Sequence, residues 1–156
     1  MDLIFWRHAE AEDENENEAL ADIDRPLTAK GEKQAQRVGA WLDRHLPEGT
    51  RVLCSPALRC QQTALALGRK FTLRDELAPG AAAADLLQVA QWPHARHPVM
   101  IVGHQPALGE VLAQLLHLPN GGCAVRKGAV WWLRTRERDG DEQTLVWAVQ
   151  SPETAA

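Results

Sequence analysis

A short apolar run that ends in two chemically versatile side chains limits what this chain can fold into. Residues 3–6 are Leu-Ile-Phe-Trp, and Arg7 and His8 follow them directly. Such a run predicts a strand buried on both faces, as in the parallel sheets of α/β proteins. Because ligands bind at the carboxyl ends of these strands, we expect Arg7 and His8 to lie at a binding crevice.

Two further segments repeat this pattern. Residues 51–54 and 98–102 are predicted strands, and each is followed by a small or polar residue and a stretch suited to a helix.

Apolar spacing predicts a helix from the cap Thr28 to about Leu46, with Ala35, Val38, Leu42 and Leu46 on its buried face. Further helices are predicted over 56–69 and 82–91, and another carries the apolar stripe Leu108, Val111, Leu112, Leu115 and Leu116. This alternation of strands and helices favours an α/β protein with a parallel sheet.

The C-terminal part of the chain predicts a β-hairpin. Residues 129–134 and 144–150 flank a polar segment that contains Asp139-Gly140, a dipeptide typical of tight turns. We expect Trp131, Trp132 and Trp147 in these strands to pack against the rest of the protein.

Length and composition exclude several classes of protein. The 156 residues fit one domain, 1–156, and the net charge of −4 lacks the basic excess of a nucleic-acid binder. No apolar stretch approaches the roughly 20 residues that span a membrane, and no signal-peptide pattern precedes Arg7, so we expect a cytoplasmic protein. Three cysteines without a C-x-x-C pair predict neither a disulfide framework nor a zinc knuckle.

An acidic segment follows the first strand. Its six carboxylates are Glu10, Glu12, Asp13, Glu14, Glu16 and Glu18. We expect a solvated loop, because so dense a charge run does not suit a buried helix. The alternative is that this loop repels small polyanions and selects a partner surface by charge.

Three predicted strand-to-helix junctions carry groups able to bind an anion. Arg7 and His8 follow the first strand, Arg59 lies just after the second, and His104 follows the third. Parallel strands end at one edge of a sheet, so we expect these side chains to converge there. Two guanidinium groups and two imidazoles in an acidic protein predict a site for a dianion. The other histidines, His45, His94, His97 and His117, are expected to face solvent.

These junction residues fall within a set of motifs. The chain resembles the histidine phosphatase superfamily, and among its short bacterial members it resembles the SixA-type phosphohistidine phosphatases. The matching pieces are Arg7-His8, Arg25-Pro26-Leu27-Thr28-x-x-Gly31, Ser55-Pro56-x-x-Arg59-x-x-Gln62-Thr63, Glu76-Leu77-x-Pro79 and Gly103-His104-Gln105-Pro106. The resemblance implies a three-layer α/β sandwich of the phosphoglycerate mutase-like kind, with a mostly parallel sheet and helices on both faces.

The resemblance also implies roles for five residues. His8 is the expected nucleophile, Arg7, Arg59 and His104 are expected to hold the phosphoryl group, and Glu76 is a possible proton donor. Imidazole attacks only when it is neutral, and neighbouring guanidinium groups disfavour its protonation. Because two arginines supply the positive charge, no metal and no cofactor are expected. A metal held by His8 and Glu10 is the alternative.

The implied function is removal of phosphate from a histidine of a signalling or phosphotransfer protein, such as a histidine phosphotransfer domain, through a covalent phosphohistidine intermediate. A chain this short leaves little material to cover the site, so a protein surface could dock there. One alternative is a small phosphomonoesterase or phosphoglycerate-mutase-like enzyme that acts on metabolites. Another is a phosphate-binding module without catalysis. The sequence carries no signal for an oligomeric state.

Ala9 departs from the superfamily pattern, which has glycine after the histidine. Alanine disfavours positive φ angles, so we predict ordinary backbone angles in the loop after His8.

Overall fold

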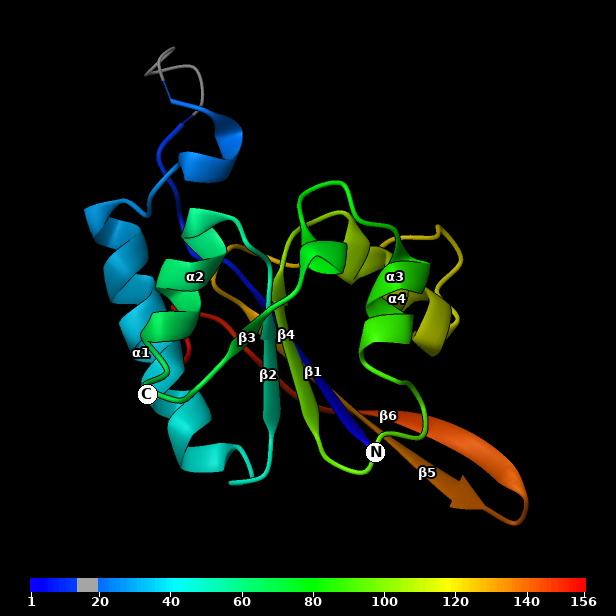
Figure 1. The fold of residues 1–156 in the computed structure, drawn as a ribbon. Coiled ribbons are helices and arrows are strands. Elements are labelled where there is room, and N and C mark those ends of the chain that lie inside the picture. Colours follow the sequence, from blue (N-terminus) through cyan, green and yellow to red (C-terminus); the bar gives the residue numbers. More distant parts are fainter. Residues whose placement is uncertain (14–19) are drawn as a thin grey trace.

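A six-stranded sheet forms the centre of the computed structural model, which describes residues 1–13 and 20–156 (Figure 1). The strands are β1 (Asp2–Arg7), β2 (Arg51–Cys54), β3 (Thr72–Leu73), β4 (Val99–Gly103), β5 (Val130–Arg138) and β6 (Asp141–Gln150). Their order across the sheet is β3-β2-β4-β1-β5-β6, in which β3, β2, β4 and β1 are parallel and β5 and β6 are antiparallel. The predicted mostly parallel sheet is confirmed.

Helices cover both faces of this sheet. Helices α1 (Ala29–His45) and α2 (Leu58–Leu65) pack on one face, and α3 (Ala83–Val89) and α4 (Ala107–Leu116) pack on the other (Figure 1). The buried side chains of β1 alternate between the two layers, as strand geometry requires. Leu3 and Phe5 join the apolar cluster of α3 and α4, whereas Ile4 and Trp6 join that of α1 and α2. The three-layer sandwich is therefore confirmed.

Helix α1 follows its predicted bounds. The Thr28 hydroxyl accepts a hydrogen bond from the Gly31 backbone N–H at 2.9 Å and thereby caps the first turn. A Cβ atom at Gly31 would lie 1.9 Å from the Glu10 carbonyl oxygen, so this position requires glycine. The cap and the close approach fix α1 against the segment that follows β1.

Helix α2 is shorter than predicted. It spans Leu58–Leu65 rather than 56–69, and Gly68 has a φ of +78°. That angle lies outside the helical region, so the chain leaves the helix before Arg69. The shorter α2 still carries Arg59 in its first turn.

The hairpin of β5 and β6 turns at Asp139-Gly140, where both φ angles are positive, as in the tight turns that suit twisted strands. A β-bulge follows in β6, because Trp132 pairs with Ala148 whereas Leu133 pairs with Val146. Trp147, the extra residue, is 53% exposed. Its ring packs against the Arg134 guanidinium, whose Cζ lies 3.7 Å from the ring centroid, so Trp147 contacts the protein on one side and faces solvent on the other.

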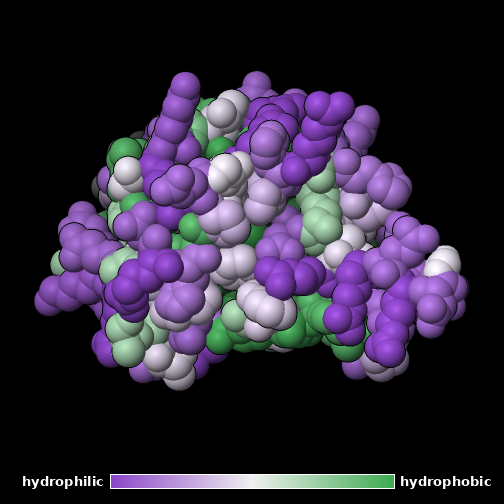
Figure 2. All heavy atoms as spheres, turned by 90° about the horizontal axis from the view of Figure 1, so that it is seen from below, coloured by the Kyte–Doolittle hydropathy of each residue, from purple (hydrophilic) through white to green (hydrophobic). Residues whose placement is uncertain are grey.

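The surface at the start of the parallel strands is mostly hydrophilic (Figure 2).

At the other end of these strands, hydrogen bonds hold the first part of the acidic segment against the protein. The Glu10 backbone N–H donates to Gln34 at 3.0 Å, and the Glu10 carboxylate accepts from the Thr28 hydroxyl at 2.8 Å. Glu10 is therefore not a freely solvated charge. Glu14, Glu16 and Glu18 lie outside the described residues.

No helix within residues 1–13 and 20–156 has both the length and the apolar character needed to cross a bilayer.

Candidate active site

Three parallel strands deliver the predicted side chains to one edge of the sheet. Arg7 ends β1 beside Gly103, the last residue of β4, and β2 ends beside β4 at Cys54. The His8 and His104 rings lie 5.3 Å apart between centroids, and Arg59 Nη2 lies 3.4 Å from His104 Nδ1. His8, Arg59 and His104 are buried, and Arg7 is half-buried. The structure thus brings Arg7, His8, Arg59 and His104 into one group, called here the cationic cluster.

His8 has a defined tautomer. Its Nδ1 lies 2.8 Å from the Ala9 carbonyl oxygen, and a carbonyl only accepts, so Nδ1 carries the proton and donates it. The other ring nitrogen, Nε2, therefore holds a lone pair. Burial lowers the pKa of His8 to about 3, and the nearby His104, Arg59 and Arg7 act in the same direction. The ring is uncharged at neutral pH.

Thr63 holds the loop after His8 against α2. Its hydroxyl accepts from the Ala9 backbone N–H at 3.0 Å and donates to the Arg59 carbonyl at 2.8 Å. Ala9 is not among the residues with positive φ, which confirms the predicted backbone angles. One hydroxyl therefore positions the loop after His8 and the turn that carries Arg59.

The two guanidinium groups keep part of their hydrogen-bonding capacity. Arg7 donates from Nη1 to the Val125 carbonyl at 2.8 Å, and Arg59 donates from Nη1 to the Asp22 carbonyl at 2.8 Å. Among the residues that the structure describes, neither Nε atom has a partner. Burial and the charge of Arg59 lower the pKa of Arg7. Two adjacent cations with unused donors suit a bound anion.

His104 is turned toward the interior on one side. Its Nε2 lies 2.8 Å from Ser55 Oγ and 3.4 Å from Cys60 Sγ. Burial, with the charge of Arg59 next in size, lowers the pKa of His104 to about 4. In this neutral ring Nδ1 faces Arg59 of the cluster, whereas Nε2 faces the buried Ser55 and Cys60.

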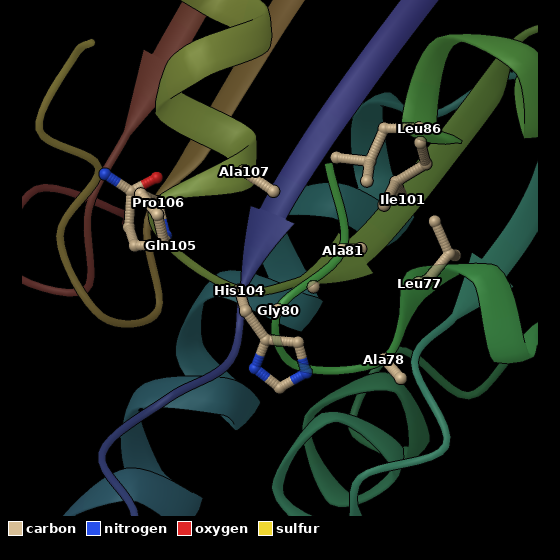
Figure 3. Close-up of a pocket in the computed structure, with 11 residues that line it drawn as sticks. Leu77, Ala78, Gly80, Ala81, Leu86, Ile101, His104, Gln105, Pro106 and Ala107 are labelled. Carbon is tan, nitrogen blue, oxygen red and sulfur yellow. The ribbon is translucent and has the colours of Figure 1, made fainter. Parts of the chain in front are cut away.

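A hollow lies beside the His104 ring (Figure 3). Its interior volume of about 10 Å³ suffices for one water molecule at most. The lining is apolar apart from His104 and Gln105, and comes from Leu77, Ala78, Gly80, Ala81, Leu86, Ile101, Gly103, Pro106 and Ala107. Of the four cluster residues, only His104 lines this hollow.

Among the residues that the structure describes, Glu76 has no hydrogen bond to the cationic cluster. Its carboxylate is about half exposed and accepts from Arg74 Nε at 2.9 Å. The surface hollow that Glu76 lines contains none of the four cluster residues. The proton-donor role of Glu76 thus stays a prediction without a contact to support it.

Potential metal ligands do not cluster in the part of the chain that the structure describes. Among residues 1–13 and 20–156, no three His, Cys, Asp or Glu side chains gather as potential ligands. The Glu10 carboxylate, the second member of the alternative metal pair, accepts a hydrogen bond from Thr28.

Several residues that contact the cluster received no role from the sequence, among them Asp22, Ser55 and Thr63. Ser55 and Thr63 stand in the motif that contains Arg59, so the motif itself was the available signal. Asp22 stands outside every motif. Its carboxylate pairs with Arg25 at 2.9 Å and with Arg59 at 3.3 Å. The four other histidines are exposed, as predicted.

Comparison with known proteins agrees with the geometry. A family model described as histidine phosphatase superfamily, branch 1, matches residues 3–82. The chain belongs to this superfamily. It is 34% identical over 131 residues to the phosphohistidine phosphatase SixA homolog of Haemophilus influenzae, covering 74% of this chain and 77% of that protein. It is 30% identical over 125 residues to SixA of Escherichia coli K12, covering 74% of each.

A solved structure extends the likeness over almost the whole chain. The protein histidine phosphatase SixA complexed with tungstate superposes with a TM-score of 0.73 at 25% identity, over 97% of both chains. As a member of this superfamily, the chain is a phosphatase that uses a histidine nucleophile.

Proposed function

We propose that residues 1–156 form a single-domain, metal-independent phosphohistidine phosphatase that acts on a phosphorylated histidine of a signalling or phosphotransfer protein. The observation that carries this proposal is the tautomer of His8. Its Nδ1 donates to the Ala9 carbonyl at 2.8 Å, so Nε2 carries the lone pair, and burial together with the nearby Arg7 and Arg59 keeps the ring uncharged.

His8 is the nucleophile in this scheme. The bond between phosphorus and the substrate imidazole breaks as a bond from phosphorus to His8 Nε2 forms, and the departing imidazole takes up a proton from solvent. Water then attacks phosphorus, the bond to Nε2 breaks, and inorganic phosphate leaves. Burial of a neutral ring supports this role, because a protonated imidazole has no lone pair at Nε2.

Arg7, Arg59 and His104 bind the phosphoryl group. Charge on the equatorial oxygens grows during in-line transfer, and fixed donors aimed at those oxygens lower the barrier. The unpartnered Nε atoms of Arg7 and Arg59 support this role. Because the guanidinium groups supply the positive charge, no step of this scheme requires a metal.

The substrate class follows from the leaving group. An alkoxide needs a strong general acid, and Glu76, the candidate for that task, is paired with Arg74. Transfer from one imidazole to another is nearly balanced and needs less assistance. The names of the curated relatives point the same way. These features favour a phosphorylated protein, such as a histidine phosphotransfer domain, over a sugar phosphate.

The test compares substrates directly. Turnover is measured on a phosphorylated histidine phosphotransfer domain and on a panel of sugar phosphates, each with and without EDTA. We expect faster turnover of the carrier protein and no effect of EDTA. The exposed-histidine variant His97→Ala is the matched control for handling and should behave like the unaltered protein.

Three results would contradict the proposal. A preference for sugar phosphates would favour the metabolite phosphatase, and loss of activity in EDTA would exclude the metal-independent scheme. Tight binding of the phosphorylated carrier without turnover would favour a phosphate-binding module.

A further inference from the structure

Ser55 contacts the cationic cluster through His104. It follows β2, is fully buried, and has its hydroxyl oxygen 2.8 Å from His104 Nε2. The Ala57 backbone N–H donates to the same oxygen at 3.2 Å. This hydroxyl is the closest hydrogen-bonding partner of His104.

The two nitrogens of the His104 ring face partners of different kinds. Nδ1 faces Arg59 Nη2 at 3.4 Å, and a guanidinium group only donates, so Nδ1 must carry a lone pair. Nε2 then carries the ring proton and donates it to Ser55 Oγ. The free protein therefore holds His104 with its ring proton directed at the fully buried Ser55.

This arrangement conflicts with binding a phosphoryl group. Phosphoryl oxygens accept hydrogen bonds, so His104 needs a proton on Nδ1 to donate to one. A second proton on the ring would supply it, but in the free protein burial and the neighbouring cations oppose that proton, and both ring nitrogens already have partners. The other route is exchange of tautomers. It requires a group beside Nε2 that accepts in one state and donates in the other, and a serine hydroxyl does both.

We infer that Ser55 is a positioning residue that sets the tautomer of His104. It accepts from Nε2 in the free protein and turns to donate to Nε2 when a tetrahedral anion occupies the cationic cluster. Nε2 loses the proton that Nδ1 gains, through solvent, and the ring stays neutral. The inference rests on the proposed function only in taking the cluster as the phosphoryl-binding site.

Cys60 is the competing partner of Nε2, with Sγ at 3.4 Å. Burial raises the pKa of its thiol to about 12, so it remains protonated and is a weak hydrogen-bonding group. Cys60→Ala is therefore the matched control for Ser55. The titratable and charged groups that surround His104 are Arg7, His8, Asp22, Arg25, Arg59 and Cys60.

Nitrogen NMR on the unaltered protein tests the inference without a mutation. The imidazole nitrogens are followed at pH 7 with and without tungstate, the anion of the SixA complex. We expect a proton on Nε2 in the free protein and on Nδ1 alone in the complex. A proton that stays on Nε2, or protons on both nitrogens in the complex, would overturn the inference.

Variants separate Ser55 from Cys60. Removing a partner from a buried group predicts that Ser55→Ala lowers kcat about 10- to 100-fold and abolishes the tautomer exchange. Ser55→Thr keeps the hydroxyl and should restore the exchange, and Cys60→Ala should leave kcat within about threefold. Normal exchange in Ser55→Ala would contradict the inference. These NMR results do not depend on the substrate, so a failure of carrier turnover would reject the proposed function and leave the role of Ser55 intact.

Discussion

Arg59 and Arg134 each form an ion pair with an aspartate, but the two guanidinium groups differ in how many N–H donors remain free for a ligand. Arg134 donates from Nε and Nη2 to the two oxygens of Asp2 at 2.8 and 2.9 Å and lies 3.7 Å over the Trp147 ring. The hydrogen bond to Asp2 raises the pKa of Arg134. Its charge is thus neutralised within the fold.

Arg59 is the more buried of the two, with 4% of its side chain accessible against 35% for Arg134. Its anionic partner is nevertheless weaker, because the Asp22 carboxylate lies at 3.3 Å and the remaining contacts are to the uncharged Asp22 carbonyl and His104 ring. Its Nε has no partner in the described part of the chain. The comparison teaches that burial with incomplete pairing distinguishes a binding arginine from a structural one.

Removing each arginine should break this comparison most clearly. Arg59→Ala should lower kcat/KM on the phosphorylated carrier by roughly 10²- to 10³-fold, because a fixed donor to the transferring group is lost. Arg134→Ala should leave kcat/KM within about twofold, since its guanidinium contacts Asp2 and Trp147 only within the fold. Equal losses in the two variants would show that burial and pairing do not separate the two roles.

The cationic cluster should also make stability depend on pH. His8 and His104 have pKa values of about 3 and 4 in the folded protein, against about 6.5 in the unfolded chain. The unfolded chain therefore binds more protons as pH falls from 7 to 5, and the free energy of unfolding should drop by on the order of 2–4 kcal/mol. Urea denaturation at the two pH values measures this change.

A glutamine at position 8 sharpens the same test. His8→Gln cannot take up a proton in either state, so the drop between pH 7 and pH 5 should be about half as large. His97→Gln, at an exposed site, should leave the drop unchanged. If the unaltered protein is equally stable at both pH values, His8 and His104 are not held uncharged in the folded state.

The smallest expected effect concerns the structural pair. Arg134→Ala should lower the free energy of unfolding by about 1–2 kcal/mol, because Asp2 loses two charge-assisted hydrogen bonds. Arg126→Ala breaks the exposed 3.4 Å pair with Glu153 and should cost less than about 0.5 kcal/mol. Chemical denaturation at pH 7 compares the two variants, and a larger loss for Arg126→Ala would reverse the argument.

Much of the fold was predictable because its signals are local. The apolar runs of β1, β2 and β4 and the Thr28 cap of α1 depend on neighbouring residues, and all four appear as expected. The large exposed fraction of Trp147 was not predictable, because it depends on a bulge between β5 and β6, which local alternation does not specify. The early end of α2 likewise follows from the backbone angle at Gly68.

The candidate site divides in the same way. Its four main side chains follow strand ends, so parallel topology was enough to predict that they meet. Asp22 contacts Arg59, 37 residues further along the chain, and Ser55 contacts His104, 49 residues further along. Local sequence patterns do not predict either contact. Glu76 was chosen by motif alone, and three-dimensional structure pairs it with Arg74.

Trapping of the covalent intermediate tests the central claim most directly. The protein is mixed with phosphorylated carrier, quenched in alkali within milliseconds, and mapped by mass spectrometry. The account predicts an acid-labile phosphoryl group on His8, and predicts that His8→Ala forms none and loses roughly 10⁴-fold or more of its turnover while remaining folded. A phosphoryl group on another residue, or normal turnover by His8→Ala, would contradict it.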